Sequence, residues 1–112
     1  MRLNTREIGD VVVLDLDGKI AGGADYEVFV PALRSLVQSG HRKVVVNLEG
    51  VSWINSTGLG ILIAGFAEMQ RSGGVLKLAK VSPRIESLLA VTKLGNVFES
   101  YGQEDDAVRS FV

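Results

Sequence analysis

The sequence is poor in the side chains on which most catalytic and metal sites depend. It contains no cysteine, which excludes disulfides and thiolate chemistry, and it has a single histidine. That residue, His41, stands beside Arg42 and Lys43 in a predicted turn, where a solvated imidazole is the simplest interpretation. The spacing of the remaining residues yields no Ser-His-Asp set and no metal-ligand cluster. We therefore expect no catalytic residue, no metal, no cofactor and no enzyme activity.

Excess charge and long hydrophobic runs are missing as well. The formal net charge of −1 gives no electrostatic reason to expect nucleic acid or an anionic membrane as a partner. The longest nearly uninterrupted apolar run, residues 59–67, is too short to span a bilayer, and the first residues do not resemble a signal peptide. We expect a cytoplasmic protein. Its 112 residues suffice for a single domain with its own core, over 1–112.

Strand-like and helical hydrophobic spacings alternate along the chain. Apolar runs predict strands at residues 3–8, 11–17, 43–48, 75–79 and 94–98, with a hairpin turn at 9–10. Helical spacing predicts helices after the cap Asp25, from Ser56 or Thr57 to Ser72, from Pro83 after the cap Ser82, and over 104–112. This order predicts the α/β class. We expect a mixed sheet of about five strands, an opening hairpin followed by alternating strands and helices, covered by about four helices.

Three local alternatives stay open at this point. Pro31 interrupts the first helical pattern, so that helix either kinks there or starts late with Pro31 in its first turn. The second helix is capped either by Asn55 or by Ser56. Trp53 either fills the space between strand and helix or anchors a partner.

The residues around position 56 favour a site of modification. Ser56 and Thr57 are adjacent hydroxyls at the start of a long apolar helix. Helix N-termini carry unpaired N–H groups and a partial positive charge, so they stabilise an added phosphate, which brings about −1.5 to −2 charge units. Two glycines follow, Gly58 and Gly60, and each costs roughly 1 kcal/mol relative to alanine in a helix. A surface without side chains allows a partner's backbone or a nucleotide to approach closely, so we expect Gly58 to be exposed for recognition.

Residues 46–60, Val-Asn-Leu-Glu-Gly-Val-Ser-Trp-Ile-Asn-Ser-Thr-Gly-Leu-Gly, resemble the phosphorylation motif of the STAS domain, the anti-sigma-factor antagonist family. Residues 16–18, 73–74 and 81–83 extend the likeness over nearly the whole chain. The resemblance implies a STAS fold and a partner switch. In that switch the unmodified antagonist binds an anti-sigma serine kinase of the GHKL type and frees a sigma factor. The kinase then phosphorylates the serine that matches Ser56, and a phosphoserine phosphatase resets the switch.

The resemblance also implies a partner-binding surface and shows two departures within it. The surface would comprise Asn55, Ser56, Thr57, Gly58 and Leu59, together with Lys19, Ala21 and Gly22 from the loop after the second strand. Asn55 stands where the family has an aspartate, which removes one negative charge. The family's Gly-Glu-φ-Asp loop reads Gly-Lys-Ile-Ala at residues 18–21, which removes its acidic character.

Two other functions compete with the switch. In a STAS scaffold subunit of a transporter ATPase or of a sensory assembly, Ser56 would only be a helix cap. In a small nucleotide-binding or hydrolytic enzyme, Ser56 would be the nucleophile. The sequence offers that enzyme no base and no phosphate-binding glycine pattern of the P-loop or dinucleotide type.

Overall fold

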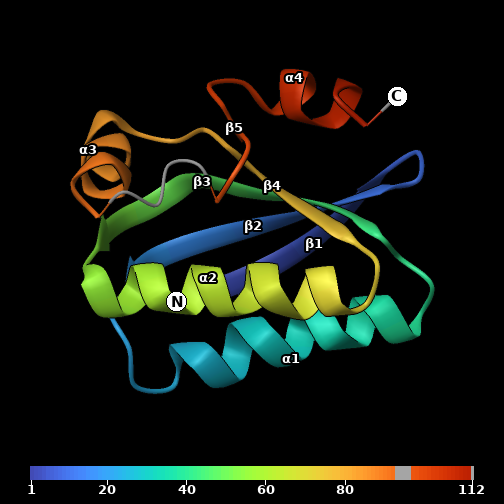
Figure 1. The fold of residues 1–112 in the computed structure, drawn as a ribbon, viewed down its shortest axis with the longest axis horizontal. Coiled ribbons are helices and arrows are strands. Elements are labelled where there is room, and N and C mark those ends of the chain that lie inside the picture. Colours follow the sequence, from blue (N-terminus) through green and yellow to red (C-terminus); the bar gives the residue numbers. More distant parts are fainter. Residues whose placement is uncertain (93–96, 112) are drawn as a thin grey trace.

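The computed structural model describes residues 1–92 and 97–111, and within them the chain forms one mixed sheet with helices around it (Figure 1). The strands are β1 (Arg2–Ile8), β2 (Val11–Ile20), β3 (Lys43–Ile54), β4 (Val75–Ala79) and β5 (Ser100–Tyr101), in the order β1-β2-β3-β4-β5. β1 is antiparallel to β2, and the later neighbours pair in parallel. The helices are α1 (Asp25–Gln38), α2 (Ser56–Arg71), α3 (Pro83–Val91) and α4 (Glu104–Arg109). The predicted fold class, α/β with five strands and four helices, is confirmed.

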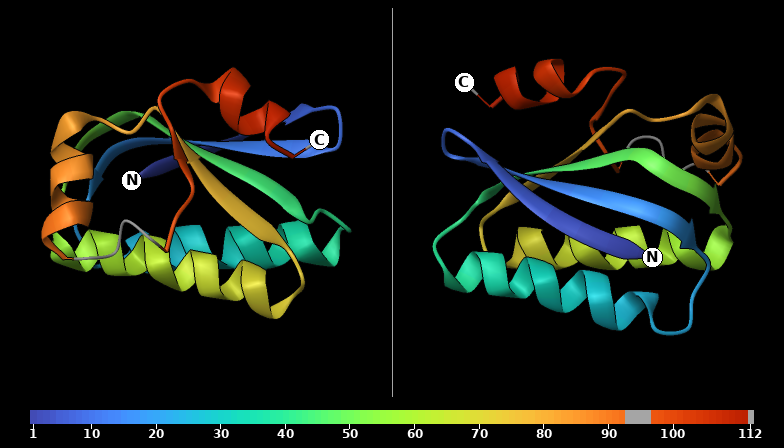
Figure 2. Two further views of the ribbon diagram at one scale, coloured as in Figure 1. Left: turned by 45° about the horizontal axis from the view of Figure 1, so that its top comes forward. Right: turned by 180° about the vertical axis from the view of Figure 1, so that it is seen from behind.

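The two faces of the sheet are covered differently. α1 and α2 lie side by side on one face, α4 lies on the other, and α3 sits at one end (Figures 1 and 2). Val44 and Val46 face α1 and α2 in the main core, whereas Val45 belongs to a smaller apolar cluster with Ala107 of α4. All three valines are fully buried, as consecutive apolar residues in a doubly covered strand predict.

Strands β2 and β3 run further than the sequence pattern predicts. β2 continues past Gly18 to Ile20, and β3 continues past Leu48 to Ile54. The register between them shifts between Asp15 and Asp17 and again between Gly18 and Lys19. Such irregularities change which face each later side chain occupies, so the period-2 alternation fails although pairing continues. The extension carries β3 to the residue before Asn55.

The start of α1 corrects one expected cap and decides one alternative. Ala24, not Asp25, occupies the N-cap position, and Asp25 is the first helical residue. Its carboxylate instead accepts the backbone N–H of Ala21 at 3.0 Å. α1 includes Pro31 as an interior residue, so the late start is wrong. None of the helices that the structure describes combines the length and apolar character that crossing a bilayer requires.

The predicted strand at residues 94–98 is wrong where it can be compared. Positions 93–96 lie outside the described residues, and Val97 and Phe98 lie in a turn. The fifth strand is Ser100–Tyr101, which pairs with Leu78 and Ala79 of β4. Two residues are too few for a sequence period, so neighbouring β4 sets this strand's position. The terminal helix begins at Glu104 as predicted and ends at Arg109.

Candidate functional site

Asn55 is the cap of α2. Its backbone is extended, with φ −116° and ψ −175°, and its Oδ1 accepts the N–H of Gly58 at 2.8 Å. The backbone carbonyl of the same residue accepts the N–H of Leu59 at 2.9 Å. One side chain thus satisfies one of the helix's unpaired donors. The open choice between Asn55 and Ser56 is decided for Asn55, so capping does not require the Ser56 hydroxyl.

Ser56 and Thr57 are both exposed in the first turn of α2, and their surroundings differ. A Cβ built on Gly22 would lie 3.0 Å from Cγ2 of Thr57, so the threonine methyl faces the loop between β2 and α1. The φ of +121° at Gly22 is a backbone conformation that favours glycine. Thr57 therefore packs against this loop and lies one helical step away from Ser56.

The loop between β2 and α1 is held against the cap. The side-chain amide of Asn55 donates from Nδ2 to the carbonyl of Ala21 over 3.4 Å, and its backbone N–H donates to Ile20 over the same distance. The N–H of Ala21 in turn donates a hydrogen bond to the Asp25 carboxylate. This hydrogen bond is the largest of the interactions that lower the pKa of the Asp25 carboxyl. The predicted partner residues Ala21 and Gly22 thus lie beside Asn55 and Thr57. Lys19 is exposed on β2. Its partner in the pairing of β2 with β3 is Trp53, which is half-buried.

Gly58 is buried, which contradicts the expectation of an exposed glycine. A Cβ on Gly58 would lie 1.9 Å from the carbonyl oxygen of Ile20 and 3.0 Å from Cγ1 of Ile54. The close backbone approach predicted from this glycine exists, but the approaching backbone is that of Ile20 in the same chain and not that of a partner. Leu59 is 1% exposed and belongs to the core, so its side chain is not available to a partner. Gly60 is exposed and a Cβ there would meet open space.

Two carboxylates, Asp15 and Glu104, form ion pairs on the sheet face that α4 covers, opposite the face covered by α1 and α2. Asp15 and Glu104 both accept hydrogen bonds from the guanidinium of Arg6, which lowers the pKa of both carboxyls. Asn47 donates to Glu104 at 2.9 Å and so connects the same group to β3. These residues line a polar cavity of about 480 Å³. The ion pair with Arg6 gives Asp15 a structural role.

Sequence reasoning overlooked the outer face of α3. The side chains of Arg84, Ser87, Leu88 and Val91 line a groove together with Ile54, the residue before the cap. Counted from Arg84, the other three α3 residues follow at three, four and seven positions, which is the spacing of one helix face. The sequence therefore contained the signal for this face next to the buried residues Ile85 and Leu89. Of these residues, Ile54 belongs to the chain segment that leads directly into the site, and the others belong to α3.

Known proteins share this fold. A family model described as STAS domain matches residues 2–107. An anti-sigma-B factor antagonist from Bacillus subtilis is 30% identical over 99 residues, which cover 85% of this chain and 89% of that protein. The crystal structure of an anti-sigma factor antagonist from Mycobacterium paratuberculosis superposes with a TM-score of 0.81 at 22% identity, covering 97% of this chain and 92% of that one.

A second solved structure, the Bacillus cell fate determinant SpoIIAA in the phosphorylated form, gives a TM-score of 0.74 at 18% identity, with 99% of this chain and 100% of that chain covered. The family model spans almost the full length, and the resemblance seen in the motif at residues 46–60 is confirmed. The chain belongs to the STAS domain family.

Proposed function

We propose that this chain is an anti-sigma factor antagonist whose activity is switched by phosphorylation of Ser56. Unmodified, it binds an anti-sigma serine kinase of the GHKL type and frees a sigma factor. The kinase transfers the γ-phosphoryl group of ATP to the Ser56 hydroxyl, and the complex separates. A phosphoserine phosphatase removes the phosphate. In this role the chain is a substrate and a binding partner, not an enzyme.

One observation carries the proposal. Ser56 is exposed in the first turn of α2 while the neighbouring Asn55 supplies the cap. A phosphate on Ser56 would lie near the positive end of the helix dipole, and the first turn of α2 contains no acidic residue to repel it. The folded chain can therefore carry the modification.

The related proteins support the same function. The Bacillus subtilis relative is named an anti-sigma-B factor antagonist, and the SpoIIAA structure is of a phosphorylated form. Those names describe those proteins. Together with the accessible hydroxyl of Ser56, they favour the switch over a scaffold in which this serine has no chemical role.

The binding surface in this proposal surrounds the hydroxyl. It comprises Asn55, Ser56 and Thr57 at the start of α2, with Lys19, Ala21 and Gly22 from the end of β2 and the following loop. Gly58 and Leu59 lie behind these residues and hold them in place. A phosphate in the centre of such a surface would be a buried, unpaired charge in the complex, which costs several kcal/mol and explains the separation.

Binding calorimetry with the purified kinase tests this account. Ser56→Asp should weaken binding strongly, whereas Ser56→Ala should bind nearly as well as the wild type. Ser35→Asp is the matched control, because Ser35 is an exposed serine of α1 outside the proposed binding surface. Equal binding by all three variants would remove Ser56 from the interface and favour the scaffold function.

A further inference from the structure

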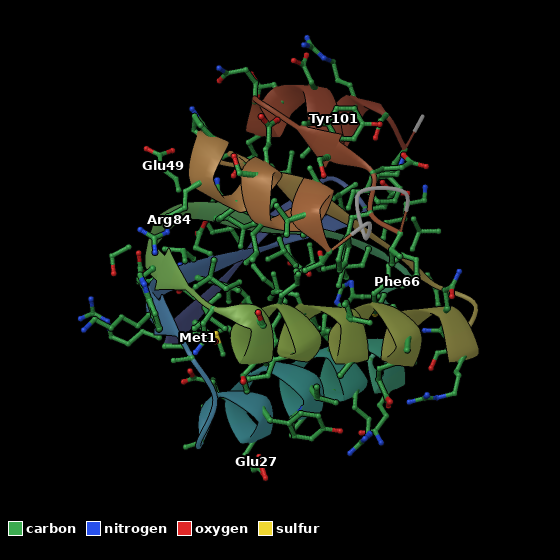
Figure 3. The ribbon with its side chains drawn as sticks, turned by 60° about the vertical axis from the view of Figure 1, so that its left-hand side comes forward. Met1, Glu27, Glu49, Phe66, Arg84 and Tyr101 are labelled. Atoms are coloured by element: carbon green, nitrogen blue, oxygen red, sulfur yellow. The ribbon has the colours of Figure 1, made fainter. Side chains whose placement is uncertain are left out.

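Strand β1 has an open edge. It stands at one end of the strand order, so in the part of the chain that the structure describes it pairs only with β2. The pairing covers Arg2–Ile8 without a bulge, and β1 contains no proline, although bulges and prolines commonly stop an edge strand from pairing with another chain. Figure 2 shows β1 at the near side of the sheet in its right-hand view. Met1, labelled in Figure 3, donates from its backbone nitrogen to Asp25 of α1 over 3.2 Å, so the residue before β1 leads onto a face of the sheet and leaves the edge open.

The hairpin turn determines which backbone groups of β1 point to this edge. Ile8 and Val11 flank a two-residue turn and are partners in the pairing, which makes them a hydrogen-bonded pair. Bonded and non-bonded positions alternate along an antiparallel strand, so Ile8 and every second residue before it bond to β2. The backbone N–H and C=O groups of Leu3, Thr5 and Glu7 therefore point away from the sheet, where a further strand can bond to them.

The charged side chains in the second half of β1 are turned toward their own chain. Charges on an edge strand normally discourage pairing with another chain. The guanidinium of Arg6, however, donates to Asp15 of β2 at 2.6 Å and to Glu104 of α4 at 3.3 Å. The carboxylate of Glu7 lies 3.4 Å from the imidazole of His41. These two side chains thus have partners within the chain and do not guard the edge.

The sequence of β1 is complementary to a second copy of itself. Homodimers usually have a twofold axis, and an axis perpendicular to the sheet pairs two copies of an edge strand in antiparallel order. With Thr5 on the axis, the seven residues of both strands overlap completely and no two like charges are opposed. The opposed residues are then Arg2 with Ile8, Leu3 with Glu7, Asn4 with Arg6, and Thr5 with itself. An axis at Asn4 or at Arg6 would oppose two arginines and leave part of the strand unpaired.

We infer that β1 is a dimerisation edge, at which two copies of the chain join their sheets into one continuous sheet. In this register every outward N–H and C=O group of Leu3, Thr5 and Glu7 bonds to the second copy, as in other cases of strand addition. Ile8, which is 37% exposed in the single chain, gains contact with the aliphatic stem of the opposed arginine. The pairing uses β1 alone, whereas Ser56 belongs to α2, so this inference does not rest on the proposed function.

Sedimentation equilibrium of the wild type tests the dimer over a concentration series from about 10 µM to about 1 mM. The apparent mass should rise from that of one chain toward that of two. Thr5→Lys and Thr5→Glu each oppose two like charges on the axis, so each should raise the Kd of the dimer at least about tenfold. Thr5 is exposed, and we expect both variants to keep the circular dichroism spectrum of the wild type. Ser35→Lys and Ser35→Glu are the matched controls on exposed Ser35 of α1, and they should dimerise like the wild type.

A mixture of the two Thr5 variants tests the register. Thr5→Lys in one copy and Thr5→Glu in the other oppose unlike charges on the axis, which stabilises a cross-strand pair. An equimolar mixture should therefore form dimers at concentrations where each variant alone is monomeric. In the other two registers, position 5 is opposed to position 3 or to position 7, so the two new charges do not meet.

Three results would overturn the inference. The first is a wild type that stays monomeric over the whole series. The second is a wild-type dimer whose Kd neither Thr5→Lys nor Thr5→Glu changes, because the contact would then lie elsewhere on the molecule. The third is a mixture of these two variants that remains monomeric. An extended peptide of another protein that adds to β1 of a monomeric wild type would assign the edge to that partner, and it too would overturn the inference.

Discussion

Gly58 of α2 lies against the backbone of Ile20 at the end of β2, so closely that a Cβ on Gly58 would be 1.9 Å from the Ile20 carbonyl oxygen. This contact fixes the start of α2 to the loop that precedes α1. The same loop is tied to Asn55 through the carbonyl of Ala21. The exposed hydroxyl of Ser56 therefore stands on a base built from two segments that are far apart in the sequence and in direct contact in the fold.

Gly58→Ala should destabilise the fold strongly. The added Cβ would also lie 2.6 Å from the carbonyl carbon of Ile20, and backbone cannot move aside as a flexible side chain can. Overpacking typically costs 1–3 kcal/mol, and we expect a loss of about 3 kcal/mol or more in the free energy of unfolding. Gly60→Ala is the control and should stabilise the helix by roughly 0.5–1 kcal/mol, because nothing lies within 4 Å of its Cβ. Denaturant unfolding measures both; a fully stable Gly58→Ala variant would refute the contact.

Asn55→Asp should lower the stability of the unmodified protein. Aspartate keeps the cap to Gly58 and gains about 0.3–1 kcal/mol from the helix dipole. It loses the donor to Ala21, whose carbonyl then faces a carboxylate oxygen, and a lost hydrogen bond costs about 1 kcal/mol before that repulsion is added. We expect a net loss of about 0.5–1 kcal/mol. Thermal melting at neutral pH tests it, and a higher melting temperature for Asn55→Asp would show that the dipole outweighs the Ala21 bond.

Acid should weaken the attachment of α4. The pKa of the Glu104 carboxyl is lowered by the guanidinium of Arg6 and, less strongly, by Asn47. A carboxyl whose pKa is lower in the folded than in the unfolded chain stabilises the fold above the unfolded pKa of about 4.3, and this contribution disappears as the pH falls through the folded pKa.

Glu104→Gln should therefore be less stable than the wild type near neutral pH and approach it in acid. Asp105→Asn, a change at the exposed neighbouring residue, is the matched control for the loss of a carboxylate that the Arg6 guanidinium does not bind. Urea unfolding across the acidic range measures the two differences. If the loss of unfolding free energy caused by Glu104→Gln grew in acid, it would contradict the conclusion that Arg6 stabilises the Glu104 carboxylate.

The elements with strong local signals could be predicted from the sequence. β4 has the predicted bounds, and Ser82 caps α3 by accepting the N–H of Ile85 at 3.2 Å. The exposed hydroxyl of Ser56 at the start of a helix followed from its position between strand and helix patterns. In each case the deciding interaction lies within a few residues along the chain.

The features that depend on distant partners could not be predicted. Gly58 indicated a close approach, but the sequence does not show that the approaching group is Ile20 of its own chain. The amide of Asn55 was interpreted as a missing charge, whereas its Nδ2 also reaches Ala21 across the fold. The irregular pairing of β2 with β3 removed the alternation that would have indicated the extension to Ile54.

The central claim is that Ser56 accepts the phosphate, and one measurement tests it most directly. The wild type, Ser56→Ala and Thr57→Ala are each incubated with ATP and the purified kinase, and the intact mass and the modified peptide are determined. We predict one added phosphate on the wild type and on Thr57→Ala, located at Ser56, and none on Ser56→Ala. A Ser56→Ala variant that still gains a phosphate, or a wild-type phosphate located at Thr57, would contradict the account.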